Sequence, residues 1–450
     1  MKRQNERTTD DKEKSYGENA LYELDGRLPI AKAVPFGLQH VLAMFVSNIA
    51  PIMIVAGACG FDQVTTAQII QCAMLIAGIG TLVQLFPVLW LGSGLPIVMG
   101  ISFTFVSVAC VVGGRYGYGA IVGAVLVGGI VEGILGLFAR YWIRLVTPIV
   151  SASVVTAIGF SLLSVGANSF GGGSGSDSFG SAQNWILGTV TLLSCILFHI
   201  FAKKYFKQLS VLFGLVVGYV VAVIMGCVDF SGIASAGIID IPRFMPFKME
   251  FHPSAIIAFV LIFMVSACET IGDTSAIASA GLARDVTTKE LSGSITCDGF
   301  VSAFSALFGC MPITSFSQNV GLVAMTKVVN RIAIATGAVI MLLAGIFPIF
   351  GAVLATLPES VLGGCTIMMF GTIVTSGMQM IGKAGYTQRN ITIAALSLSI
   401  GLGFTQVPEL FRVFPEIIQT VFAENCVAVV FVCAIVLNLV LPKNMEVEQG

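Results

Sequence analysis

Long apolar runs separated by short polar breaks extend from about Phe36 to Leu441. A helix needs about 20 apolar residues to cross the hydrocarbon core of a bilayer. The pattern predicts fourteen helical spans, two of which (101–113 and 318–328) are too short to cross as helices. The spans are expected at 36–58, 66–91, 101–113, 118–138, 147–167, 185–202, 209–228, 254–280, 293–309, 318–328, 332–356, 360–381, 390–404 and 424–441.

A Pro-Ile pair precedes each of the two short spans. The stretches are residues 96–103 and 312–319, and their prolines lie 216 positions apart. Proline lacks a backbone N–H, and β-rich residues follow it, so each stretch is expected to be extended before a half-helix begins. Such paired, interrupted segments in corresponding halves indicate the substrate site of a transporter, although two coincidental proline kinks are the simpler alternative. With seven spans in each half, an odd number, the two halves would insert into the membrane with opposite topology.

Composition places the chain in lipid. Of 450 residues, 56% are hydrophobic and 10% are charged, whereas a soluble chain carries roughly 25% charged residues. No apolar run leads the chain, so we expect no cleaved signal peptide. The eleven cysteines lie mostly in apolar spans without a CxxC pair, which favours small buried side chains over a metal or disulfide site. The sequence predicts one integral membrane unit.

The positions of Lys and Arg predict its orientation. With fourteen spans both termini lie on one side, and that side carries most of the 23 basic residues. Only Arg115, Arg243, Lys248 and Arg412 fall on the opposite side. Because loops rich in Lys and Arg stay in the cytoplasm, both termini are expected there.

Two carboxylates in the eighth span are candidates for chemistry. Glu269 and Asp273 stand at positions i and i+4, which places both on one helix face. An ionisable group in a span is costly and therefore a functional candidate, and two poorly solvated acids favour a proton on at least one of them. Hydrogen bonding to neighbouring helices alone is the structural alternative.

Other polar residues in the spans allow more than one role. Asp298 in the ninth span is expected either to cap a half-helix or to exchange protons with the eighth span. His40 is as easily structural as functional. Glu132 is buried by its position in the fourth span, and no partner for it can be named. Gln318 and Asn319 are adjacent amides at a half-helix start, which would suit the edge of a heterocycle.

Residues 318–327 begin with Gln-Asn-Val-Gly and end with Thr326-Lys327, and four residues (322–325) separate Gly321 from Thr326. This segment resembles the signature of the nucleobase–ascorbate transporter family, and the similarity covers about 36–441. The resemblance implies an all-α 7+7 inverted repeat with two short antiparallel strands that meet at the substrate. It implies an elevator-type movement of a core domain against a gate domain, with proton-coupled uptake and no cofactor besides the proton. A homodimer through the gate helices in the plasma membrane, bound by lipid and by no nucleic acid, is also implied.

The implied domains and site follow by position. We expect an N-terminal tail at 1–35, core at 36–167 (running into the first gate span) and 231–356, gate at 168–230 and 357–441, and a C-terminal tail at 442–450. The residues implied to contact the base are Glu269, Gln318, Ser102, Phe103 and Ser317. The residues implied to support coupling and orientation are His40, Asp273, Asp298 and Asn319.

The substrate subgroup can also be argued. Uracil carriers of this family have Glu at the Gln318 position and His at the Asp273 position, so this chain is expected to take xanthine or, second, urate. Ser102 stands where xanthine-selective relatives often carry Asn, which weakens the choice between those two purines. The alternatives are another nucleobase permease, an inorganic-anion carrier of the same fold, and an intramembrane enzyme. No His-Glu-x-x-His or Gly-x-Ser-x-Gly motif supports an enzyme.

Overall fold

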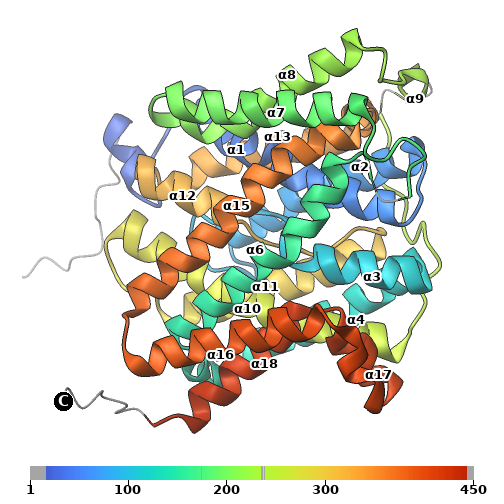
Figure 1. Cartoon of the computed structure of the whole chain (residues 1–450). Coiled ribbons are helices and arrows are strands. Elements are labelled where there is room, and N and C mark those ends of the chain that lie inside the picture. The colour runs from blue at the N-terminus through green and yellow to red at the C-terminus, as the bar shows by residue number, and fades with distance from the viewer. Residues whose placement is uncertain (1–16, 174, 235–236, 238, 443–450) are drawn as a thin grey trace, which may run out of the picture.

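The computed structural model describes residues 17–173, 175–234, 237 and 239–442, and this part of the chain is mostly helical (Figure 1). Within it, eight helical segments are long and apolar enough to cross a membrane. They are α1 (Ile30–Ala58), α2 (Gln63–Leu85), α4 (Tyr118–Leu137), α6 (Pro148–Phe170), α7 (Ala182–Phe201), Phe206–Ile224 with α8 (Ser210–Ile224), α10 (Pro253–Leu282) and α15 (Glu359–Ala384).

Two bent pairs raise the number of crossing segments among these residues to ten if each pair is one span. One joins α13 (Arg331–Ile346) to α14 (Pro348–Ala355) at 79°, and the other joins Glu416–Ala423 to α18 (Cys426–Val440) at 93°. The first bend lies in the predicted span 332–356, where Pro348 lacks the N–H that would continue α13. The predicted span 66–91 is also too long, because α2 ends at Leu85, ahead of Pro87.

The remaining helices are shorter or more polar. Half-helices α3 (Val106–Tyr116) and α12 (Ser317–Thr326) fall in the two short predicted spans, and α11 (Thr288–Leu307) and α16 (Gln388–Thr405) fall in two others. The short elements are η1 (Gly17–Tyr22), η2 (Phe103–Phe105), α5 (Ala139–Trp142), η3 (Ile143–Leu145), η4 (Lys204–Leu209), α9 (Ser231–Ala234), η5 (Pro408–Val413), α17 (Glu416–Ile418) and η6 (Gln419–Ala423).

A two-stranded sheet precedes the half-helices. Strand β1 (Met99–Ile101) pairs antiparallel with β2 (Ile313–Ser315), with Gly100 opposite Thr314. Each strand has three residues, so only the middle of each predicted extended stretch pairs. All six strand residues are buried.

Side chains close both outer edges of this sheet. A backbone N–H inside a membrane needs a partner, because no water is present to replace one. Two strand amides on each edge donate to a side-chain oxygen of a neighbouring helix. The acceptors are Thr81 Oγ1 and Asn48 Oδ1 on β1 (2.9 and 2.7 Å), and Ser302 Oγ and Asp298 Oδ2 on β2 (3.1 and 2.9 Å).

The helices pack in two groups. In the first, α2 packs on α13 and α11 on α4, while α1 packs on α13 and α10 on α4. In the second, α6 packs on α15, α7 on α8, and α16 on α18. Figure 1 shows α7 and α8 along the top, α16 and α18 along the bottom, and α6 and α15 crossing the middle of the view. The sheet and both half-helices belong to the first group, so the second group forms one wall beside them.

Part of the predicted N-terminal tail is folded onto the first group. The buried amide of Asn330 donates to the carbonyl oxygens of Ala20 (2.8 Å), Glu23 (3.2 Å) and Gly26 (2.8 Å). Its Oδ1 accepts from two amides in the first turn of α13, at 3.0 and 3.2 Å. One side chain therefore caps a helix and fixes the chain ahead of α1.

The neighbouring Arg331 extends this connection. Its guanidinium contacts Asp25 Oδ1 and donates to the carbonyl of Gly94, both at 2.7 Å. Gly94 lies in the loop just before β1, so the N-terminal segment, that loop and the start of α13 are tied together. Residues 1–16 and 443–450 of the two predicted tails lie outside the described residues.

We expect Asn330→Ala to lower the free energy of unfolding by about 2–4 kcal/mol. A lost cap costs about 1 kcal/mol, and each buried carbonyl left without a donor costs about 1–3 kcal/mol, partly recovered by relaxation. The thermal unfolding midpoint of the purified protein in detergent measures this loss. Arg331→Gln is the matched control, since its partly exposed ion pair contributes about 1 kcal/mol or less. Equal midpoints for the two variants would contradict the central role of Asn330.

Candidate functional site

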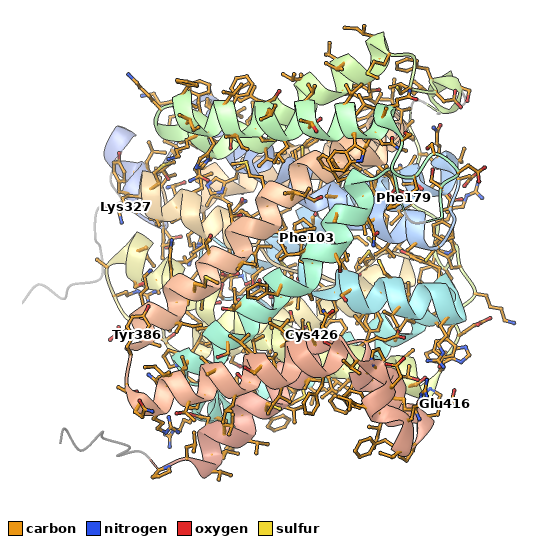
Figure 2. The ribbon with its side chains drawn as sticks, viewed as in Figure 1. Phe103, Phe179, Lys327, Tyr386, Glu416 and Cys426 are labelled. Carbon is orange, nitrogen blue, oxygen red and sulfur yellow. The ribbon has the colours of Figure 1, made fainter. Side chains whose placement is uncertain are left out.

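A cavity of about 400 Å³ lies where the half-helices meet α10 and the second helix group. Among the predicted site residues it is lined by Ser102, Phe103, Glu269, Asp273, Ser317 and Gln318. Helices α6 and α15 provide the opposite wall, and the lining reaches Lys383 near the end of α15. Phe103 lies near the middle of the molecule, whereas Lys327 and Tyr386 lie toward one side of it (Figure 2). Pockets of about 300–1,000 Å³ suit small organic ligands.

Both half-helices start at this cavity. Ser102 is extended and its hydroxyl accepts from the amide of Thr104 at 3.3 Å, which caps η2 ahead of α3. Phe316 is also extended, and α12 begins at Ser317. A helix N-terminus carries unpaired N–H groups and a partial positive charge. Two such ends beside one cavity favour an acceptor or anionic group of a ligand.

The two carboxylates of α10 both face the cavity, as their spacing predicts. Glu269 Oε2 accepts from the hydroxyl of Thr104 at 2.7 Å. The Ser317 hydroxyl lies 2.9 Å from Asp273 Oδ2 and 3.4 Å from Glu269 Oε1. A hydroxyl has one proton to donate, and the shorter distance assigns it to Asp273. The second oxygen of Glu269 therefore keeps acceptor capacity for a ligand.

Asp298 is placed behind the cavity, with every partner inside the protein. It is fully buried on α11 and accepts from the Ser315 amide (2.9 Å), the Thr270 hydroxyl (2.7 Å) and the Gln84 amide (3.1 Å). Ser315 also lies 3.4 Å from Asp273 through its hydroxyl, so Asp298 and the cavity acids share one strand. This geometry makes Asp298 an anchor for β2.

His40 and Asn319 lie apart from the cavity. Asn319 is buried against α1, where its amide lies 3.5 Å from the carbonyl of His40. Asn319 Oδ1 and His40 Nδ1 are buried without a hydrogen-bond partner. The structure separates the adjacent amides, because successive side chains on a helix point about 100° apart. Gln318 lines the cavity and Asn319 does not.

No specific sequence pattern indicated several of the hydroxyl and amide groups of the site. Thr104 and Ser315 bond the acids directly, and Thr270 and Gln84 hold Asp298. Ser and Thr are common in membrane helices, so their presence alone marks no site. The repeat spacing was one available signal. Thr81 and Asp298 are separated by nearly the same number of positions as the two prolines (216), and each accepts a hydrogen bond from the backbone of one strand.

Known permeases resemble this chain over most of its length. A profile described as "Permease family" matches residues 31–410. The xanthine permease of Bacillus subtilis is 32% identical over 93% of this chain and 96% of its own length. Xanthine permease XanQ of Escherichia coli is 33% identical over 96% of this chain and 96% of its own length. Uric acid permease PucK of Bacillus subtilis is 35% identical over 83% of this chain and 87% of its own length.

A solved structure shares the fold at low identity. The transmembrane domain of a cyanobacterial bicarbonate transporter, BicA, superposes with a TM-score of 0.56 and 15% identity, covering 92% of this chain and 99% of that domain. The chain is therefore an integral membrane transporter rather than an enzyme, and it belongs to the nucleobase–ascorbate transporter family.

Proposed function

We propose that this protein takes up a purine nucleobase, xanthine first and urate second, together with protons. The observation that carries the proposal is the pair Glu269 and Asp273 on one cavity, beside the N-termini of both half-helices. Relatives named for xanthine and uric acid support the purine class. The plane of the base would lie against Phe103, whose ring is held edge-on by Phe370 at a centroid distance of 5.3 Å.

The hydrogen-bonding groups of the cavity suit such a base. Xanthine and urate present ring N–H donors, and the free acceptor capacity of Glu269 can take one or two of them. The Gln318 amide both donates and accepts, which suits a carbonyl next to an N–H. The half-helix N-termini would lie near the carbonyl oxygens or the negative charge of the base.

The proposed movement is an elevator-type exchange of a core domain against a gate domain. The first helix group would be the core and the second the gate. Their packing supports a 7+7 inverted repeat, because each contact has a counterpart seven predicted spans away: α2 on α13 with α11 on α4, and α7 on α8 with α16 on α18. The cavity reaches Lys383, beside a basic loop, so we infer that it opens toward the cytoplasm, where both termini would also lie.

The gate helices would also contact lipid or a second copy of the chain. Only 22% of the most apolar stretch of α7 is buried, against 72% for α1. A homodimer through the gate in the plasma membrane would cover part of this apolar surface. The carrier would bind the purine and the proton and no other cofactor.

Uptake into proteoliposomes tests the proposal. Labelled xanthine should accumulate with an inward proton gradient, and a protonophore should abolish that accumulation. Unlabelled urate should compete, with hypoxanthine, uracil and bicarbonate as the other competitors. Sodium-dependent uptake that a protonophore leaves unchanged would contradict proton coupling. Competition by bicarbonate but not by purines would favour an inorganic-anion carrier instead.

A further inference from the structure

A third carboxyl group lies outside both networks of the site. Glu132 on α4 is fully buried, and neither of its carboxyl oxygens has a hydrogen-bond partner. None of the ion pairs within the described residues includes it. It is not among the residues that line the cavity.

The helices around Glu132 pack too closely to admit bulk solvent. A Cβ on Gly129 would lie 2.6 Å from the carbonyl oxygen of Gly299, and one on Gly136 would lie 2.4 Å from the backbone N of Thr296. Both glycines are one turn from Glu132, so α4 and α11 are in direct contact on either side of it. Helix α10 also packs on α4, where a Cβ on Gly128 would meet the ring of Phe263.

The neighbours of Glu132 are polar but carry no positive charge. Ser266 on α10 faces it, and the Ser266 hydroxyl is itself buried without a partner. The titratable groups that interact electrostatically with Glu132 are Asp298 on α11 and Glu269 and Cys268 on α10. Among the described residues, the Ser266 hydroxyl is the donor that an ionised carboxylate could reach here; no cation pairs with it, and two acids lie nearby.

The free-energy cost of that charge decides the protonation state. An unpaired ion buried in a protein costs several kcal/mol even after relaxation. A neutral carboxyl avoids this cost and gains an O–H donor, which the neighbouring Ser266 hydroxyl can accept. Glu132 therefore holds a proton in the conformation described here.

Polar groups on one face of α10 lie between Glu132 and the site. The Ser266 carbonyl accepts from the Thr270 hydroxyl at 3.0 Å, and the same hydroxyl lies 2.7 Å from Asp298. Thr270 also accepts from Ser315, whose hydroxyl reaches Asp273 at 3.4 Å. One side of α10 thus carries polar groups from Glu132 to the carboxylates of the cavity.

We propose that Glu132 is a second proton-binding site of the transporter, linked to the charge on Glu269 and Asp298. Because all three groups are acids, negative charge at the cavity favours the proton on Glu132, and its neutralisation favours release. On release the O–H bond of Glu132 breaks and its carboxylate keeps the electron pair, while an ionised acid of the site, Glu269 or Asp298, forms the new O–H bond. This role rests on the proposed proton coupling.

Glu132→Gln tests the role, because the amide keeps the shape of a protonated acid and has no proton to release. We expect xanthine binding and counterflow of the purified variant to stay within about twofold of wild type, a difference below about 0.5 kcal/mol. Accumulation driven by a proton gradient should fall at least about tenfold, and the pH dependence of xanthine affinity should flatten. Glu132→Asp, which keeps an acid, should retain part of the accumulation.

Infrared spectroscopy of the purified protein gives a readout of Glu132 itself. The wild type should show the carbonyl band of a buried protonated carboxylic acid, and Glu132→Gln should lack it. Wild-type accumulation and pH dependence in Glu132→Gln, or a wild-type spectrum without this band, would overturn the proposal. If Glu132→Gln folds poorly, the accumulation measured for Glu132→Asp and the carboxylic acid band in the wild-type spectrum still test the proposal. A failure of the proposed proton coupling can be told apart from a failure of the Glu132 proposal, because wild-type uptake would then also resist a protonophore.

Discussion

Glu269→Gln should abolish high-affinity purine binding, with a loss of about 2–4 kcal/mol, or roughly 30- to 1,000-fold in Kd. One carboxyl oxygen accepts from Thr104 at 2.7 Å, and the other faces Ser317 at 3.4 Å and the cavity. An amide can accept at only one of these places. Its NH₂ group would face either the Thr104 hydroxyl, which would have to turn and accept, or a ring N–H of the base, where a donor would meet a donor. In both cases the charge-assisted hydrogen bonds of the carboxylate are lost.

Equilibrium binding of labelled xanthine to the purified protein measures this effect. Asp273→Asn is the matched control, because it makes the same chemical change one turn along the same helix. Asp273 holds the Ser317 hydroxyl at 2.9 Å, so its variant should bind xanthine measurably and lose gradient-driven accumulation. Both variants must first be shown to reach the membrane. Normal binding by Glu269→Gln, or normal accumulation by Asp273→Asn, would contradict the corresponding role.

The sequence was informative about the fold where the signal is local. Apolar runs of sufficient length locate helices, and a helix lies in every predicted span. The errors lie where a proline interrupts an apolar run: α2 ends ahead of Pro87, and the bend before Pro348 divides one predicted span. Hydropathy does not register such a bend, because the residues on both sides are equally apolar.

The site shows the same division between local and tertiary information. Spacing alone placed Glu269 and Asp273 on one face, because the helical period fixes it. The role of Thr104 depends on η2 meeting α10, and Thr104 and Glu269 lie 165 residues apart, so no local pattern indicates this contact. The folded segment 17–28 was missed for a similar reason, since its partner Asn330 lies 304–310 residues away.

Asp298 joins the fold to the site, and this explains why an acid is tolerated deep in a helix bundle. Three donors from three segments converge on it: a strand amide, a helix hydroxyl and the Gln84 side chain. A carboxylate can accept all of them, whereas an amide or hydroxyl cannot. The same acid therefore holds β2, and with it the start of α12, in place.

We expect Asp298→Asn to destabilise the protein by about 3–5 kcal/mol, because the new NH₂ group would face either the Gln84 amide or the buried Ser315 amide, and both of these are donors. This is a large share of a typical folding free energy of about 5–15 kcal/mol. Thr81→Val is the matched comparison on β1, where one strand amide loses its acceptor, at a cost of about 1–3 kcal/mol. The thermal unfolding midpoint in detergent should fall furthest for Asp298→Asn and less for Thr81→Val. An Asp298→Asn protein with the wild-type midpoint that fails to accumulate xanthine would instead assign Asp298 to proton transfer.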